Sequence, residues 1–221
     1  MKVGFIGLGS MGLPMAQRIL SAGHDLTLYA WRQTSLEPFA GTGVTIAAIP
    51  ATLGPAIEAV GICVFDAAGV EEVMFGPDGL ADTLRPGTVV LVHSTVAPAQ
   101  VRRIAERATE YGLRVLDAPV SGGGSRALAG ELTIMVGGDA EALAAVAELL
   151  AAVLGTGSSA CVAGGVRLRA GSLTALAGSQ VDVTLAKDVE LMASVLGDAP
   201  GSELVGVARR FVSAMRRGDR A

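Results

Sequence analysis

The chain has 221 residues, a hydrophobic content of 51% and a formal net charge of −4. This size is enough for one domain with a substantial core and a smaller appendage, and the acidic balance excludes nucleic acid and an anionic membrane surface as main partners. Two cysteines, Cys63 and Cys161, are too few for a disulfide framework or a four-ligand zinc site, so we expect no metal and a reduced, cytoplasmic setting. The two long uncharged stretches, residues 38–57 and 149–166, are broken by Gly, Pro, Ser or Thr, so we expect a soluble protein.

A glycine-punctuated turn separates the first predicted strand, residues 3–6, from a predicted helix over residues 11–22. Its G-x-G-x-x-G spacing suits a tight turn, a close backbone approach to a pyrophosphate and close packing of helix on strand. The phosphates would lie over the helix N-terminus, where free N–H groups and the helix dipole favour negative charge. The cofactor-binding residues predicted here are Gly7, Leu8, Gly9, Ser10, Met11 and Gly12.

Apolar strands alternate with helical segments up to about residue 153. The strands are apolar at successive positions, which is typical of a parallel sheet covered on both faces. We therefore predict an α/β fold with a doubly wound, parallel, Rossmann-like sheet. Further strands are expected at residues 26–29, 44–46, 62–65, 89–92, 115–117 and 132–136, and further helices near residues 51–58, 68–74, 97–112 and 140–153.

The end of the second predicted strand indicates which dinucleotide is bound. An acidic side chain there would bind the ribose hydroxyls of NAD, whereas an arginine accommodates the additional phosphate of NADP. Residues 28–34 contain no acid, and Arg32 lies at about the right distance from the glycines. We predict NADP, with NAD as the alternative and a solvated surface arginine as the other interpretation of Arg32.

Three later strands end in polar or glycine-rich turns at residues 65–67, 93–95 and 117–124. Ligands of open parallel sheets bind beyond these strand ends. In the third turn, a serine followed by three glycines exposes backbone N–H groups beside a hydroxyl, which suits a substrate carboxylate. Of the other polar residues, Asp66 is expected to form a strand-end turn or cap, with a catalytic acid as the other interpretation, and His93 is expected to be structural.

The pattern changes after residue 154. A Gly-, Ala- and Ser-rich stretch without a period is followed by two helical runs, of which the second, near residues 202–217, has one apolar face. Such faces must pack on the α/β domain or on another chain, and the second arrangement would be a homodimer. We divide the chain into an NADP-binding Rossmann-like domain (1–154), an irregular linker (155–180) and a short, incomplete, remnant helical domain (181–221).

Motifs in several colinear stretches carry a family resemblance: residues 4–16 with the glycine turn, then 75–80, 93–98, 117–123 and 135–138. Together they resemble the β-hydroxyacid dehydrogenases, which include 3-hydroxyisobutyrate dehydrogenase and the tartronate semialdehyde and glyoxylate/succinic semialdehyde reductases. Residues 185–189 are similar to the family's Lys-Asp element.

This resemblance implies hydride transfer between NADP(H) and a small β-hydroxyacid or semialdehyde. It places Val64, Phe65, Asp66 and Thr95 beside the nicotinamide half of the cofactor. It also implies that Ser121, Gly122 and Gly123 hold the substrate carboxylate, and that Lys187 approaches the cofactor.

Members of the family have a catalytic lysine that is closely followed by an asparagine. The chain departs from the family at this position. It has two lysines, Lys2 and Lys187, and no asparagine. Arg169 stands nearest to the expected position, but a guanidinium stays protonated and cannot accept a proton. Lys187 or a water would have to supply the proton transfer.

Two alternatives to a dehydrogenase stay open: a catalytically impaired dinucleotide-binding protein and an imine-reductase-like enzyme. The short helical region itself has two explanations, a natural deletion or a sequence discontinuity such as a frameshift.

Overall fold

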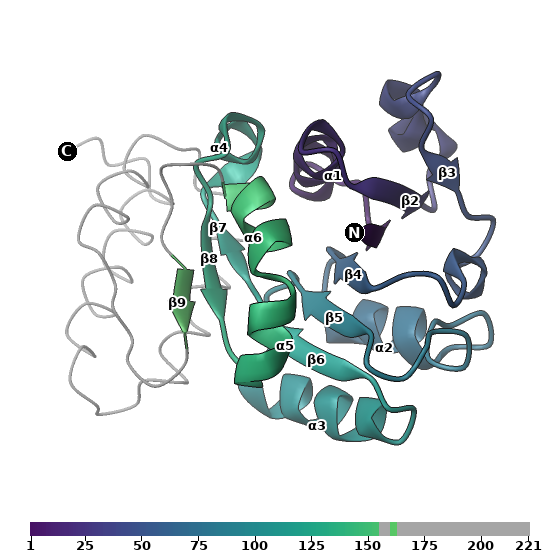
Figure 1. The fold of residues 1–221 in the computed structure, drawn as a ribbon, viewed down its shortest axis with the longest axis vertical. Helices are drawn as coiled ribbons and strands as arrows, with labels where there is room; N and C mark the ends of the chain where they lie inside the picture. Colours follow the sequence, from purple (N-terminus) through teal and green to yellow (C-terminus); the bar gives the residue numbers. More distant parts are fainter. Residues whose placement is uncertain (155–159, 163–221) are drawn as a thin grey trace, which may run out of the picture. The chain divides into compact units, whose positions relative to one another are not determined.

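The chain is built around a six-stranded parallel sheet. Its strands are β1 (Lys2–Ile6), β2 (Asp25–Tyr29), β3 (Thr45–Ile46), β4 (Ala59–Ile62), β5 (Val89–Val92) and β6 (Arg114–Asp117). The computed structural model describes residues 1–154 and 160–162, all within the compact unit Met1–Arg167. The strand order is β3-β2-β1-β4-β5-β6, and every neighbouring pair is parallel (Figure 1).

Helices cover both faces of this sheet. On one face, α1 (Gly12–Ser21), α5 (Ala140–Ala145) and α6 (Ala147–Leu154) contribute to a hydrophobic core that includes Leu91 of β5. On the other face, α2 (Ala67–Phe75) and α3 (Pro98–Thr109) contribute to a second core that includes Val90 and Val92 of the same strand.

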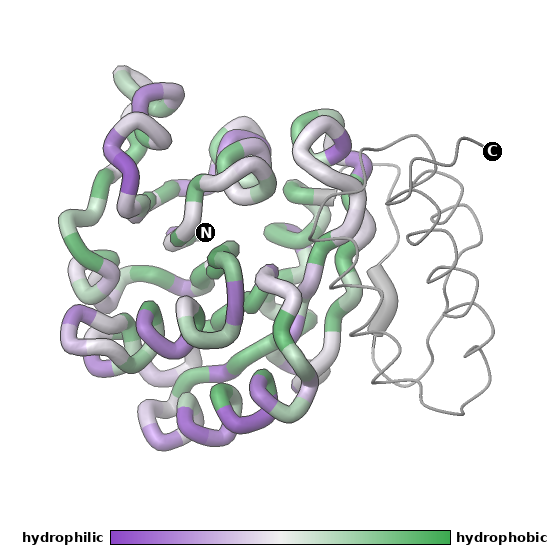
Figure 2. The backbone as a smooth tube through the Cα atoms, turned by 180° about the vertical axis from the view of Figure 1, so that it is seen from behind, coloured by the Kyte–Doolittle hydropathy of each residue, from purple (hydrophilic) through white to green (hydrophobic). Residues whose placement is uncertain are grey.

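Burial on both faces explains why the strands are apolar at successive positions, and Figure 2 shows this contrast between apolar strands and the mixed outer helices. The doubly wound α/β fold is confirmed. The predicted helical region lies outside the described residues.

A second, three-stranded sheet follows the first. It consists of β7 (Val120–Ser121), β8 (Thr133–Val136) and β9 (Ala160–Val162), with β7 antiparallel to β8 and β8 parallel to β9. The expectation that residues 132–136 belong to one parallel sheet is therefore wrong. A short apolar run in the sequence indicates that a strand is buried but not which strand it pairs with. Here α4 (Gly123–Ala129) reverses the direction of the chain before β8. β9 lies in the range predicted as an irregular linker.

The segment between β3 and β4 also differs from the prediction. In place of a helix over residues 51–58 there is a short 3₁₀ helix, η2 (Pro50–Leu53), and β4 begins at Ala59 rather than at residue 62. The helix stops because Gly54 has a φ of +82° and the next residue is Pro55, which has no N–H to donate. A second 3₁₀ helix, η1 (Gln33–Phe39), and α4 were not predicted.

No helix among the described residues combines the length and the apolar character needed to cross a membrane.

Candidate cofactor and substrate site

The glycine turn after β1 is shaped by two close backbone approaches. Gly7 has a φ of +94°, and a Cβ added there would lie 2.2 Å from the carbonyl oxygen of Cys63. A Cβ on Gly12 would lie 1.8 Å from the carbonyl oxygen of Gly7. In contrast, a Cβ on Gly9 would meet no atom of the described residues within 4 Å. Gly7 and Gly12 are therefore required by the fold, whereas Gly9 leaves the outer side of the turn open.

The N-terminus of α1 lies at this open turn. The side chain of its N-cap residue, Met11, does not cap it, and its first turn contains no acidic residue. Gly9 and Ser10 are exposed, while Leu8 is buried beneath them. Unpaired N–H groups at the positive end of a helix dipole beside an open glycine turn suit a phosphate group.

The carboxyl ends of the parallel strands place the other predicted residues at the same edge of the sheet. Arg32 follows β2, residues 64–66 follow β4, and Thr95 follows β5. Two of the large exposed apolar side chains of the described region, Trp31 (56%) and Phe65 (79%), also lie there. Exposed apolar side chains at the edge where such sheets bind ligands indicate a surface that a ligand covers.

Arg32 is exposed, and no ion pair within residues 1–154 engages its guanidinium. Its backbone is extended at the start of η1, where its carbonyl accepts a hydrogen bond from the N–H of Ser35 at 3.0 Å. The guanidinium is therefore available to an anion at the end of β2.

Two hydrogen bonds order the strand ends beyond β1. The N–H of Gly69 donates to Oδ1 of Asp66 at 3.0 Å, so this carboxylate caps α2, as the sequence suggested. The N–H of Val64 donates to the buried Oγ of Ser94 at 2.9 Å, which joins the ends of β4 and β5. Ser94 was not among the predicted site residues, because no sequence pattern marks a serine whose partner lies 30 positions away.

The Ser121 loop lies against the glycine turn. A Cβ on Gly124 would lie 2.7 Å from the carbonyl oxygen of Ser10, so a glycine lets the two segments approach. Gly122 and Gly123 have φ values of +139° and +76° and lead into α4, so this segment begins a helix rather than a flexible loop. The predicted carboxylate cradle and the predicted phosphate site are thus brought together, as the neighbouring α1 and α4 in Figure 1 show. Arg169 and Lys187 lie outside the described residues.

Two chemically versatile side chains near this edge, the buried His93 and the partly buried Cys63, pack within the fold. Nδ1 of His93 donates to the carbonyl of Ala118 at 2.9 Å, and its ring stacks on Phe5 at a centroid distance of 6.0 Å. Burial lowers the pKa of His93 from 6.5 to about 4, so the imidazole is neutral. Burial also raises the pKa of the Cys63 thiol to about 12, so it is not a nucleophile.

Asp117 lies at the end of β6, four residues before Ser121, and is partly buried. Its Oδ1 is buried without a hydrogen-bond partner in the described region. Desolvation therefore raises the pKa of Asp117 from 3.8 to about 6.

We expect these two groups to oppose each other in the pH dependence of stability. The lowered pKa of His93 makes the free energy of unfolding fall by about 3 kcal/mol as the pH drops from 6.5 to about 4. The raised pKa of Asp117 makes stability fall as the pH rises from 3.8 to about 6. Asp117→Asn removes the second effect, so urea unfolding of this variant should show stability rising between pH 4 and 6.5, more steeply than in the wild type. Parallel curves for the two proteins would contradict this.

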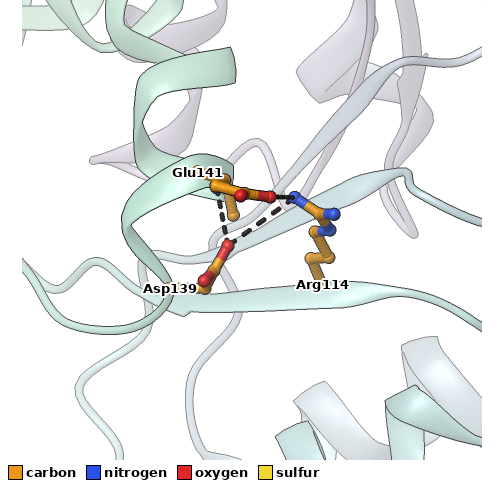
Figure 3. Close-up of polar contacts among 4 residues, drawn as sticks. Arg114, Asp139 and Glu141 are labelled. Atoms are coloured by element: carbon orange, nitrogen blue, oxygen red, sulfur yellow. Dashed lines mark hydrogen bonds and ion pairs between the residues drawn. The ribbon is translucent and has the colours of Figure 1, made fainter.

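The exposed ion pairs of Figure 3 belong to the other end of β6. Arg114 lies 3.6 Å from Asp139 and 3.4 Å from Glu141, and the N–H of Ala142 donates to Asp139 at 2.9 Å (Figure 3). These contacts fasten the start of α5 to the sheet. Because the side chains are exposed, they add little stability, and they lie at the amino end of the strand, away from the candidate site.

A parallel sheet with an open glycine turn at the N-terminus of its first helix defines a dinucleotide-binding domain. Residues 2–165 match the family described as the NAD binding domain of 6-phosphogluconate dehydrogenase. The chain belongs to this family, and within it to the β-hydroxyacid dehydrogenases.

Similar curated proteins carry dehydrogenase names. L-threonate dehydrogenase of Cupriavidus necator is 41% identical over 154 residues, covering 70% of this chain and 52% of the relative. NAD-dependent L-serine dehydrogenase of Pseudomonas aeruginosa is 42% identical over 142 residues, covering 64% of this chain and 48% of the relative. The chain thus spans about half the length of these relatives.

Solved structures show the same fold. A 3-hydroxyisobutyrate dehydrogenase from Salmonella typhimurium superposes with a TM-score of 0.69 at 29% identity, covering 99% of this chain and 79% of its own. An imine reductase variant from Myxococcus stipitatus, in complex with NAD+, has a TM-score of 0.65 at 17% identity, covering 99% of this chain and 66% of its own. At that identity the second similarity concerns the fold alone.

Proposed function

We propose that this protein is an NADP-dependent β-hydroxyacid dehydrogenase that transfers hydride between NADP(H) and a small β-hydroxyacid or semialdehyde. The observation that carries the proposal is the open glycine turn, with Arg32 at the end of the neighbouring strand and the Ser121 loop packed against it. Family membership supports the reaction class, because relatives are named as dehydrogenases of small hydroxyacids.

Each part of the site has a proposed role. The glycine turn and the N-terminus of α1 hold the pyrophosphate, and Arg32 binds the 2′-phosphate that distinguishes NADP from NAD. Residues 64–66 and Thr95 border the nicotinamide half. The hydroxyl of Ser121 and the backbone N–H groups of Gly122 and Gly123 orient the substrate carboxylate.

The proton must move separately from the hydride. In the oxidation of a hydroxyacid, bound NADP+ would supply the acceptor for the hydride of the hydroxyl-bearing carbon, and the hydroxyl proton would pass to a base. We propose Lys187 or a water as that base, and an anion-binding role for Arg169, because a guanidinium cannot accept a proton.

The absence of an asparagine from the chain favours one alternative, a dinucleotide-binding protein without turnover. Titration with NADPH, followed by turnover assays with L-threonate, L-serine, 3-hydroxyisobutyrate and small semialdehydes, separates the two. A dehydrogenase binds NADPH and oxidises or reduces at least one of them. Binding without turnover on the whole panel would establish the alternative, and imines in the same panel test for an imine-reductase-like activity.

Ser121→Ala should raise the KM for the carboxylate substrate by about tenfold, the loss expected for a hydrogen bond to a charged group. NADPH affinity should stay unchanged, because the hydroxyl faces the substrate. Steady-state kinetics on the active substrate measure both effects. Ser125→Ala, an exposed serine on α4, is the matched control. An equal loss in both variants would remove Ser121 from the substrate site.

We further propose a cytoplasmic homodimer. Support comes from the acidic, cysteine-poor composition and from the apolar face predicted for residues 202–217. Light scattering of the purified chain tests the assembly, and a monodisperse monomer would overturn it.

A further inference from the structure

Trp31 is the single tryptophan of the chain, and it is largely exposed. It follows β2 directly, and 56% of its surface is accessible. The indole contacts a neighbouring ring, because it forms a T-shaped pair with Tyr29, with ring centroids 5.1 Å apart and an interplanar angle of 67°. A largely exposed indole at the edge of the sheet that binds ligands offers apolar surface to a flat partner.

This indole is tied to the glycine turn through the backbone. Tyr29 ends β2, and its carbonyl accepts a hydrogen bond from the N–H of Gly7 at 3.3 Å. Arg32, with no ion pair in the described region, is the next residue along the chain. Ile46, at the end of β3 and in register with Leu28, is 45% exposed and adds apolar surface on the outer side.

The dinucleotide proposed above offers only one flat group to this position. Its pyrophosphate lies at the glycine turn and its 2′-phosphate at Arg32, so the adenosine ribose lies at the end of β2. Adenine is attached to that same ribose, whereas the nicotinamide lies across the pyrophosphate, toward β4 and β5. An aromatic face stacks well on a nucleobase without reading its hydrogen-bonding edge.

We propose that Trp31 is the adenine platform of this site, and that it positions the adenosine so that the 2′-phosphate reaches Arg32. This inference rests on the proposed cofactor binding. It assigns to Trp31 a role in affinity that is independent of the hydride transfer.

The probe is 2′,5′-ADP, which carries adenine and the 2′-phosphate but no nicotinamide. Because Trp31 is the only tryptophan, protein fluorescence reports its surroundings directly. NADPH absorbs where tryptophan emits and would quench it from a distance, whereas 2′,5′-ADP quenches only by contact. We expect saturable quenching by 2′,5′-ADP in the wild type.

Variants then measure the contribution to binding by calorimetry. Trp31→Leu should weaken 2′,5′-ADP and NADPH to the same extent, about tenfold, and Trp31→Phe should recover most of the loss. Binding of reduced nicotinamide mononucleotide, which lacks adenosine, should not change. Leu128→Ala removes another exposed apolar side chain, 62% accessible on α4, and is the control expected to bind like the wild type.

The outcomes separate this inference from the function on which it rests. If the wild type binds NADPH and Trp31→Leu binds 2′,5′-ADP equally well, the adenine platform is wrong and the cofactor proposal stands. If the wild type binds neither NADPH nor 2′,5′-ADP, both proposals are overturned. Circular dichroism of Trp31→Leu confirms that the variant is folded before its affinity is interpreted.

Discussion

Replacing Gly12 by alanine is expected to lower the free energy of unfolding by about 3 kcal/mol or more and to abolish dinucleotide binding. The added Cβ would lie 1.8 Å from the carbonyl oxygen of Gly7 and 3.1 Å from the ring of Phe5. A backbone carbonyl cannot move aside as a flexible side chain can, so α1 must shift away from β1. The shift would open the core that α1 shares with the sheet and displace its N-terminus from the phosphates.

Gly9→Ala is the matched comparison within the same turn. Within the part of the chain that the structure describes, no atom lies within 4 Å of a Cβ placed there, so stability should remain as in the wild type. The methyl group would occupy the open side of the turn and weaken NADPH binding by about tenfold, or 1.4 kcal/mol. Urea unfolding and calorimetric titration of both variants test the pair. Normal NADPH affinity in Gly9→Ala would place the cofactor elsewhere.

Arg32→Ala is expected to weaken NADPH binding by about 10- to 100-fold, as for loss of a charge-assisted hydrogen bond, and to change NADH binding little. The reason is electrostatic. Arg32 is exposed at the end of β2, and no ion pair in residues 1–154 neutralises it, so its charge is available to a 2′-phosphate that NADH lacks.

The matched control is Arg85→Ala, which removes an exposed arginine from the turn before β5, at the opposite edge of the sheet. Calorimetric titration of each variant with both cofactors gives the ratio of affinities. Equal losses for NADPH and NADH in Arg32→Ala would make Arg32 a general surface cation and leave the cofactor preference without a basis.

Much of the fold follows from local sequence signals. The apolar strand and the spacing of the glycines together determine a tight turn between strand and helix. The position of α1 after β1 could therefore be predicted from residues 2–21 alone. The predictions that are wrong concern segments whose structure is determined by strand pairing or by a single backbone angle. The run at residues 132–136 is as apolar as a central strand, yet it pairs with β7 and β9. The helix expected over residues 51–58 fails at Gly54 and Pro55.

The candidate site shows the same division. Residues at strand ends could be predicted, because parallel strands place their carboxyl ends at one edge. Contacts between distant segments could not. Three features depend on tertiary packing, and no spacing in the sequence encodes them. They are the approach of Gly124 to Ser10, the hydrogen bond from Val64 to Ser94, and the buried Oδ1 of Asp117, which has no hydrogen-bond partner among the described residues.

The most direct test of the central claim, that this sheet edge binds NADP, is a calorimetric titration of the full 221-residue chain with NADPH and, separately, with NADH. We expect saturable binding of NADPH with one site per chain, and weaker binding of NADH. Absence of heat and of saturation with both dinucleotides would contradict the assignment of the glycine turn, of Arg32 and of the reaction that depends on them.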